Sequence, residues 1–216
     1  MVLFCFVVVF TNTKFFAQYH TNDDLGEYSH SIGISYNNVY QYSNNWSFFK
    51  SNVAFMYNLR TDFKLGNHSS IGASFYPTIG YSFNTNLQTV DFKSRSETVI
   101  TGLPFCFELP LLIQYNTGNH SNSISRYKNG SFFGAGVCYS YYPGTNIKID
   151  ADKNTVISPG TFISVCANVG FKFSINKISY GIRFYYSKPI GITSNEKVNI
   201  FGISLLYNFG RHFKFG

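Results

Sequence analysis

Three charged residues, Glu108, Lys172 and Arg183, interrupt segments that are otherwise built from apolar, aromatic and small side chains. Each charge occupies a position that alternates with the large apolar residues, so all three are predicted to point to the same side of their strands. A charge that is enclosed away from bulk water needs a partner. We therefore expect these residues to form a hydrogen-bonded ionic plug. The alternative is a relay for protons or ions.

Three cysteines, Cys106, Cys138 and Cys166, share this inward parity and fall on three consecutive segments. In an oxidising compartment they could form one disulfide and leave a free thiol, or they could bind a soft metal. The chain has no CxxC motif and no Cys–His spacing typical of a metal site, and a free cysteine also fills small gaps in a core. We expect fillers and no cofactor, with the disulfide and the metal as alternatives.

Catalytic chemistry has weak support in the sequence. A hydrolase or acyl transferase that acts on lipid would need a serine, a histidine and an acid brought together. No G-x-S-x-G motif occurs. The histidines lie mostly in predicted termini or turns: His20, His30, His68, His120 and His212. We expect no enzymatic activity, and a membrane-embedded enzyme remains an alternative.

The elements that carry these residues have large apolar side chains at every second position. In one segment Phe105, Phe107, Leu109, Leu111, Ile113 and Tyr115 alternate with Cys106, Glu108, Pro110, Leu112 and Gln114. Such a strand has one apolar face and one mixed face. Soluble sandwiches rarely carry so much Phe and Tyr on the apolar face, whereas lipid-facing barrel strands do. The pattern predicts an all-β fold, a closed antiparallel eight-stranded transmembrane β-barrel.

Clusters of Asn, Gly, Ser and Asp divide the chain into the predicted strands. The segments are 28–40, 48–59, 69–83, 97–115, 131–142, 161–175, 178–187 and 198–215. Pro77 cannot donate to a ladder and predicts a bulge or kink, and a tight turn is expected near Asn176. With both ends of the barrel periplasmic, the loops at 37–46, 84–96, 143–159 and 188–197 face outward, and the turns at 60–68, 116–130 and 174–177 face the periplasm. An eight-stranded interior is only wide enough for its own side chains, so no large open pore is expected.

The composition excludes two classes of protein. Only 12% of the 216 residues are charged and 19% are aromatic, which is a poor surface for a soluble protein. Beyond the first residues no run is apolar for long enough to form a membrane helix. The net charge of +7 comes from Lys and Arg scattered without a basic stripe, so we expect no nucleic-acid binding.

The N-terminal segment differs from the rest of the chain. An apolar run from Val2 to Phe10 precedes Phe16-Ala17-Gln18, an arrangement typical of bacterial export signals. We predict a signal peptide at 1–18 and a barrel domain at 19–216. The alternative is that this apolar run is a buried first strand.

One strand carries a family resemblance. The run from Phe107 to Tyr115, FELPLLIQY, resembles the LEIPLLLKY strand of the PorT-like outer-membrane barrels of Gram-negative bacteria. The following Phe132-Phe133-Gly134-Ala135-Gly136 is similar to the next strand of that family. The resemblance implies a small barrel of the porin family in the outer membrane.

From these observations we expect a structural, adhesion or secretion-accessory role. The expected partners are outer-membrane lipid, the barrel-assembly machinery and a secretion or surface protein, with the barrel itself a monomer. A lipocalin-like soluble carrier is the further alternative, and it would show polar outward faces and an apolar interior.

Overall fold

The computed structural model describes residues 27–42, 46–89, 97–99, 105–118, 128–143, 145–150, 153–157, 160–176, 178–190 and 197–214. The predicted signal peptide at 1–18 lies outside these residues. The described part of the chain contains no helix that is long and apolar enough to cross a membrane.

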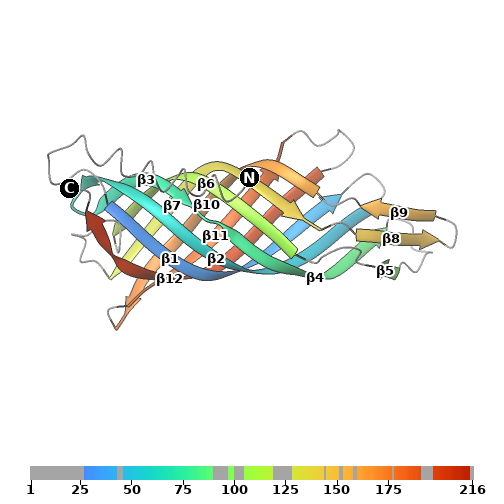
Figure 1. Cartoon of the computed structure of the whole chain (residues 1–216), viewed down its shortest axis with the longest axis horizontal. Coiled ribbons are helices and arrows are strands. Elements are labelled where there is room, and N and C mark those ends of the chain that lie inside the picture. Colours follow the sequence, from blue (N-terminus) through green and yellow to red (C-terminus); the bar gives the residue numbers. More distant parts are fainter. Residues whose placement is uncertain are drawn as a thin grey trace.

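Antiparallel strands form a closed ring in which neighbours in the sheet follow one another along the chain (Figure 1). The strands are β1 (Glu27–Tyr42), β2 (Trp46–Gly66), β3 (Ser69–Phe75), β4 (Thr78–Thr89), β6 (Phe105–Gly118), β7 (Asn129–Tyr142), β10 (Gly160–Ile175), β11 (Ile178–Pro189) and β12 (Lys197–Lys214). Because β3 and β4 share one place between β2 and β6, the ring has eight positions. The predicted all-β, closed eight-stranded barrel is confirmed.

The third position of the ring is interrupted at Tyr76 and Pro77. The strand stops at Phe75 and resumes at Thr78 without a change of register, since both pieces pair with β2 and with β6. The Tyr76 amide donates to the Pro110 carbonyl at 3.0 Å, and the Pro77 carbonyl accepts from the Tyr57 amide at 3.0 Å. The predicted irregularity at Pro77 is thus confirmed. Proline has no N–H for the ladder, and its neighbours keep the wall connected.

The ring closes between its first and last strands. In the register of β1 and β12, Ile32 lies opposite Tyr207, Ile34 opposite Leu205 and Tyr36 opposite Ile203. This pair closes the ring, as the predicted barrel requires. It also brings Glu27 opposite Lys214, so both ends of the ring's chain lie at the same end of the barrel.

Three short strands form a second sheet outside the ring. β8 (Thr145–Asp150) and β9 (Lys153–Ile157) make a hairpin, and β5 (Glu97–Val99) pairs with β8. This sheet lies at the end of the barrel opposite the labelled C-terminus (Figure 1). The prediction of one strand over 97–115 was therefore wrong, because β5 belongs to this outer sheet and β6 to the ring.

Two predicted connections are much shorter than expected. β1 continues to Tyr42 and β2 begins at Trp46, so most of the predicted loop 37–46 is strand. β2 also runs to Gly66 through most of the predicted turn 60–68. The polar residues in these segments face the interior and had suggested loops. The tight turn near Asn176 is confirmed, with a φ of 51° at that residue, a conformation that asparagine tolerates.

Candidate functional site

Each of the eight strand positions of the ring has large apolar side chains on its outer face. Successive residues on β6 illustrate this alternation, since Ile113 is 68% exposed and Leu112 only 1%. The exposed large side chains include Ile34, Phe55, Ile79, Phe105, Val137, Val165, Phe184 and Leu205. Together they cover each of the eight positions of the ring. A surface of this size and composition is suited to lipid and not to water.

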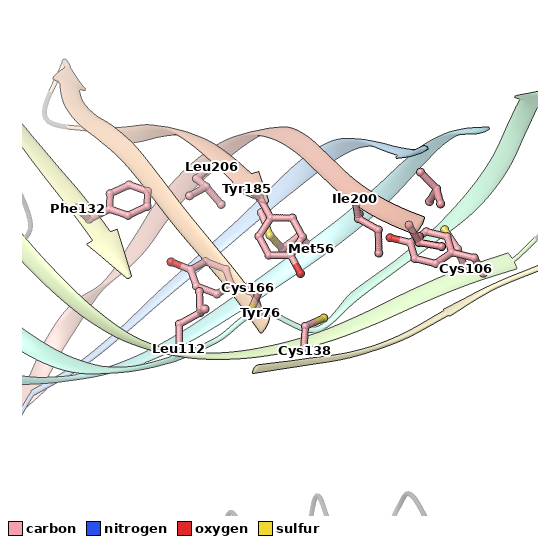
Figure 2. Packing of buried hydrophobic residues seen from close by; sticks show 13 residues of the cluster. Met56, Tyr76, Cys106, Leu112, Phe132, Cys138, Cys166, Tyr185, Ile200 and Leu206 are labelled. Atoms are coloured by element: carbon pink, nitrogen blue, oxygen red, sulfur yellow. The ribbon is translucent and has the colours of Figure 1, made fainter. Parts of the chain in front are cut away.

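The interior, in contrast, contains most of the buried polar and charged side chains. It divides into three regions along the barrel, and a cluster of buried apolar side chains extends through them. Figure 2 shows Phe132 and Cys106 at opposite ends of this apolar cluster, with Tyr76, Met56 and Tyr185 between them. The lumen is therefore filled by side chains, as expected for a ring of this size.

The region at the end where the ring's chain begins and ends is a dense polar network, which we call the base cluster. Its members are Arg60, Asp62, Ser70, Gln114, Asn116 and Lys172. Asp62 accepts from Arg60 Nε at 2.5 Å, from the Ser70 hydroxyl at 2.9 Å and from Asn116 Nδ2 at 3.3 Å. Arg60 Nη1 also donates to Asn116 Oδ1 at 2.9 Å. Arg60 and Asp62 therefore each have more than one polar partner.

Lys172 joins the base cluster from β10. Its ammonium donates to Asn116 Oδ1 at 2.8 Å and lies 5.4 Å from the centroid of the Phe132 ring. The ring lies against Gly170, where a Cβ would be only 2.3 Å from it and from the Ile182 carbonyl oxygen. A glycine at this position leaves room for the ring that contacts the lysine.

Glu108 lies in the region toward the small outer sheet. Its carboxylate accepts from Asn37 Nδ2 at 2.7 Å and from the Tyr142 hydroxyl. Asn37 in turn accepts from the Ser35 hydroxyl at 2.6 Å. Lys50 in the same region donates to the Pro143 carbonyl at 2.8 Å. Glu108 is thus held by neutral donors from β1 and β7.

Arg183 lies between these two regions. Its guanidinium carbon is 4.5 Å from the centroid of the Tyr76 ring and 4.9 Å from that of Tyr185. It is fully buried, and its Nε, Nη1 and Nη2 donate to no acceptor in the described part of the chain. In the central region, which consists of Arg183, Tyr76 and Tyr185, the contacts of the guanidinium are therefore with the π faces of two rings.

The three predicted plug residues all point inward, but the structure distributes them over separate regions. Lys172 belongs to the base cluster, Glu108 to the outer-sheet end and Arg183 to the centre. Among the described residues no ion pair or hydrogen bond joins any two of the three. The carboxylate paired in the base cluster is Asp62, and its cation partner is Arg60.

Sequence reasoning missed Arg60, Asp62 and Asn116 because it placed them in turns. The signal that could have found them is parity. Counting in steps of two from Ala54 on β2 reaches Arg60 and Asp62, and counting from Glu108 on β6 reaches Asn116. A charged residue at an inward position is therefore compatible with a continuing strand and does not indicate that the strand ends.

All three inward cysteines are buried, free and part of the apolar cluster. Cys138 and Cys166 lie opposite Ser164 and Ser187 on the neighbouring strands, and Cys106 lies apart from them along the barrel (Figure 2). No group of His, Cys, Asp or Glu with metal-binding geometry occurs among the residues described.

Comparison with known proteins gives structural neighbours only. No family model matches the chain, and no curated protein matches its sequence. The fold is similar to Ail, the attachment invasion locus protein of Yersinia pestis, with a TM-score of 0.43 and 14% identity over 86% of this chain and 99% of that one. It is also similar to Neisserial surface protein A, with a TM-score of 0.39 and 7% identity over 83% and 97% of the two chains. The outer membrane protein OprG from Pseudomonas aeruginosa gives a TM-score of 0.39 and 11% identity over 87% and 98%.

Proposed function

We propose that this protein is an integral outer-membrane barrel with a structural, adhesion or secretion-accessory role. The observation that carries the proposal is the apolar outer face, which is present on every position of a closed ring with a polar, filled interior. Closure matters because an open edge would leave backbone groups unsatisfied in hydrocarbon. A filled interior fits a role that depends on the outer surface and the ends of the barrel, and not on a wide channel.

The arrangement of faces argues against a soluble carrier. A lipocalin-like protein encloses an apolar cavity within a wetted outer surface. Here Ile34, Ile113 and Val165 are exposed on the outside, while Asn52, Asp62 and Gln114 are buried within. In water such a surface would aggregate, whereas in a bilayer it is solvated by lipid.

The resemblance of residues 107–115 to the PorT-like strand supports placing the chain in that family, and hence a secretion-accessory role. On this proposal the barrel is a monomer that needs outer-membrane lipid and the barrel-assembly machinery. A secretion or surface protein would dock at the end that carries β5, β8 and β9, because this sheet extends beyond the ring (Figure 1).

Two arginine substitutions on one strand test the membrane proposal. Val137 is 52% exposed in the middle of β7, and Asn129 begins the same strand with the same outward parity. A cation costs about 2–4 kcal/mol at the bilayer midplane and about 0–1 kcal/mol near the interface. Val137→Arg should therefore impair insertion, and Asn129→Arg should be tolerated.

The measurements are resistance to carbonate extraction and heat-modifiable migration of the full chain. The wild type and Asn129→Arg should remain in the membrane fraction and migrate faster unheated than heated. Release of the wild-type chain by carbonate alone would exclude a membrane barrel. Equal insertion of both variants would show that the outer face is not in contact with lipid.

A further inference from the structure

Arg183 is a fully buried cation whose polar edge has no protein partner. Tyr76 and Tyr185 contact the guanidinium through their rings, at 4.5 and 4.9 Å. All three nitrogens lack an acceptor, although a guanidinium carries five N–H donors. A buried polar group without a partner costs free energy, and a charged one costs more.

The charge of Arg183 cannot be removed by loss of a proton, because arginine stays protonated in proteins. Its guanidinium interacts electrostatically with Glu108, but no ion pair joins them. Both oxygens of Glu108 already accept from Asn37 and Tyr142. Among the residues that the structure describes, no carboxylate therefore neutralises this arginine at contact distance.

Further donors line the neighbouring strands. Ser140 on β7, Ser164 on β10 and Ser187 on β11 are fully buried, and their hydroxyls have no hydrogen-bond partner in the described part of the chain. Ser187 lies opposite Cys166, and Cys166 is within electrostatic range of the Arg183 guanidinium. Of the three hydroxyls, the one on Ser187 is therefore linked through Cys166 to the surroundings of Arg183, whereas Ser140 lies opposite Glu108 and Ser164 opposite Cys138.

The inward side chains also carry a net positive formal charge. Among the side chains that the structure describes, the cations directed inward are Lys50, Arg60, Lys64, Lys172 and Arg183, and the carboxylates are Glu27, Asp62 and Glu108. Arg60 pairs with Asp62, and Lys64 with Glu27 at 3.2 Å. With five cations and three carboxylates, the formal charge of these inward side chains is +2, so an additional negative charge would stabilise the interior.

We propose that the barrel interior binds a small inorganic anion of the chloride class at Arg183. The guanidinium edge supplies both the charge and the directional N–H donors. The anion must be small, because the rings of Tyr76 and Tyr185 already contact the guanidinium. This site is independent of the secretion or adhesion role and requires only the closed ring.

Bromide tests the site directly because it replaces chloride and scatters anomalously. The purified full chain in detergent is titrated with sodium bromide against sodium gluconate at constant ionic strength, and its Tm is recorded. We expect a saturable rise in Tm with bromide and with chloride, as for any ligand that binds only the folded state. Crystals grown in bromide should show an anomalous peak within hydrogen-bonding distance of the Arg183 nitrogens.

Two variants assign the effect to Arg183. Arg183→Gln should lose the halide-dependent rise, whereas Lys188→Gln, which removes an exposed cation from the same strand, should retain it. If Arg183→Gln does not fold, the bromide peak in the wild type decides alone. A Tm that is indifferent to halide, a peak absent from Arg183, or a halide effect that survives in Arg183→Gln would each overturn the proposal.

Discussion

The base cluster and the central region each contain a buried arginine, but the surroundings of the two arginines are opposite in kind. Arg60 pairs with a carboxylate at 2.5 Å and also donates to Asn116. Arg183 lies between two aromatic rings and has no protein acceptor. Both are enclosed by the same wall of strands. A fully paired arginine contributes to holding the barrel together, whereas an arginine with free donors can take a ligand.

The difference can be measured because removing a partner should have opposite consequences in the two regions. In the base cluster, truncation leaves a charge that had been paired. In the central region, removing the arginine takes away a charge that had no counterion. The stability of each variant is measured by urea unfolding of the refolded full chain in detergent.

The largest effect is expected from Asp62→Ala. It leaves Arg60 buried without its carboxylate and removes the acceptor of Ser70 and Asn116. Breaking a buried pair by removing one partner costs about 3–5 kcal/mol, which should appear as a lower urea midpoint. Asp62→Asn, which keeps the size and one acceptor, should lose less. An unchanged midpoint in Asp62→Ala would show that the cluster contributes nothing to stability.

A smaller loss of stability is expected from Tyr76→Phe, because Tyr76 contacts both regions. The Tyr76 hydroxyl donates to Gln114 in the base cluster at 2.6 Å, while its ring contacts Arg183. Removing the hydroxyl should cost about 1–3 kcal/mol, because it leaves a buried amide oxygen with a weaker partner. The halide response should persist, since the ring remains. Loss of that response would place the hydroxyl itself in the anion site.

The smallest effect is expected from Arg183→Met, measured in gluconate. The variant loses two cation–π contacts, worth about 0.5–2 kcal/mol each, and also loses an uncompensated buried charge. These contributions oppose each other, so the urea midpoint should shift little in either direction. A loss as large as that of Asp62→Ala would mean that Arg183 is paired as firmly as Arg60, and the contrast between the regions would fail.

The fold was largely predictable from the sequence because strand parity is a local property. The alternation from Phe105 to Tyr115 assigns each side chain to a face, and a closed ring follows once every strand has an apolar outer face. The pairing of the first strand with the last follows from the same requirement, because a closed ring leaves no open edge in hydrocarbon. The break at Pro77 was predictable for the same local reason.

The pairing inside the barrel was not predictable in the same way. Parity indicated that Glu108, Lys172 and Arg183 point inward, but not their positions along the axis, which depend on the stagger between strands. Turn residues were the second source of error. Asp62 is a residue type that favours turns, so the segment that contains it was assigned to a connection. The parity of β2 places Asp62 on the inward face, and its hydrogen bonds from Ser70 and Asn116 show that it is a core residue.

The seam between β1 and β12 also determines the order in which the molecule can be completed. Ser35 and Ser204 share a hydrogen bond at 3.1 Å although 169 residues separate them, and Ser31 donates to Asn208 across 177 residues at 2.7 Å. Contacts of such high sequence separation form late and slowly. Until β12 is available, β1 presents an unpaired edge that hydrocarbon cannot satisfy. Synthesis of the chain must therefore finish before the ring can seal, and integration into the bilayer and sealing of the ring must proceed together.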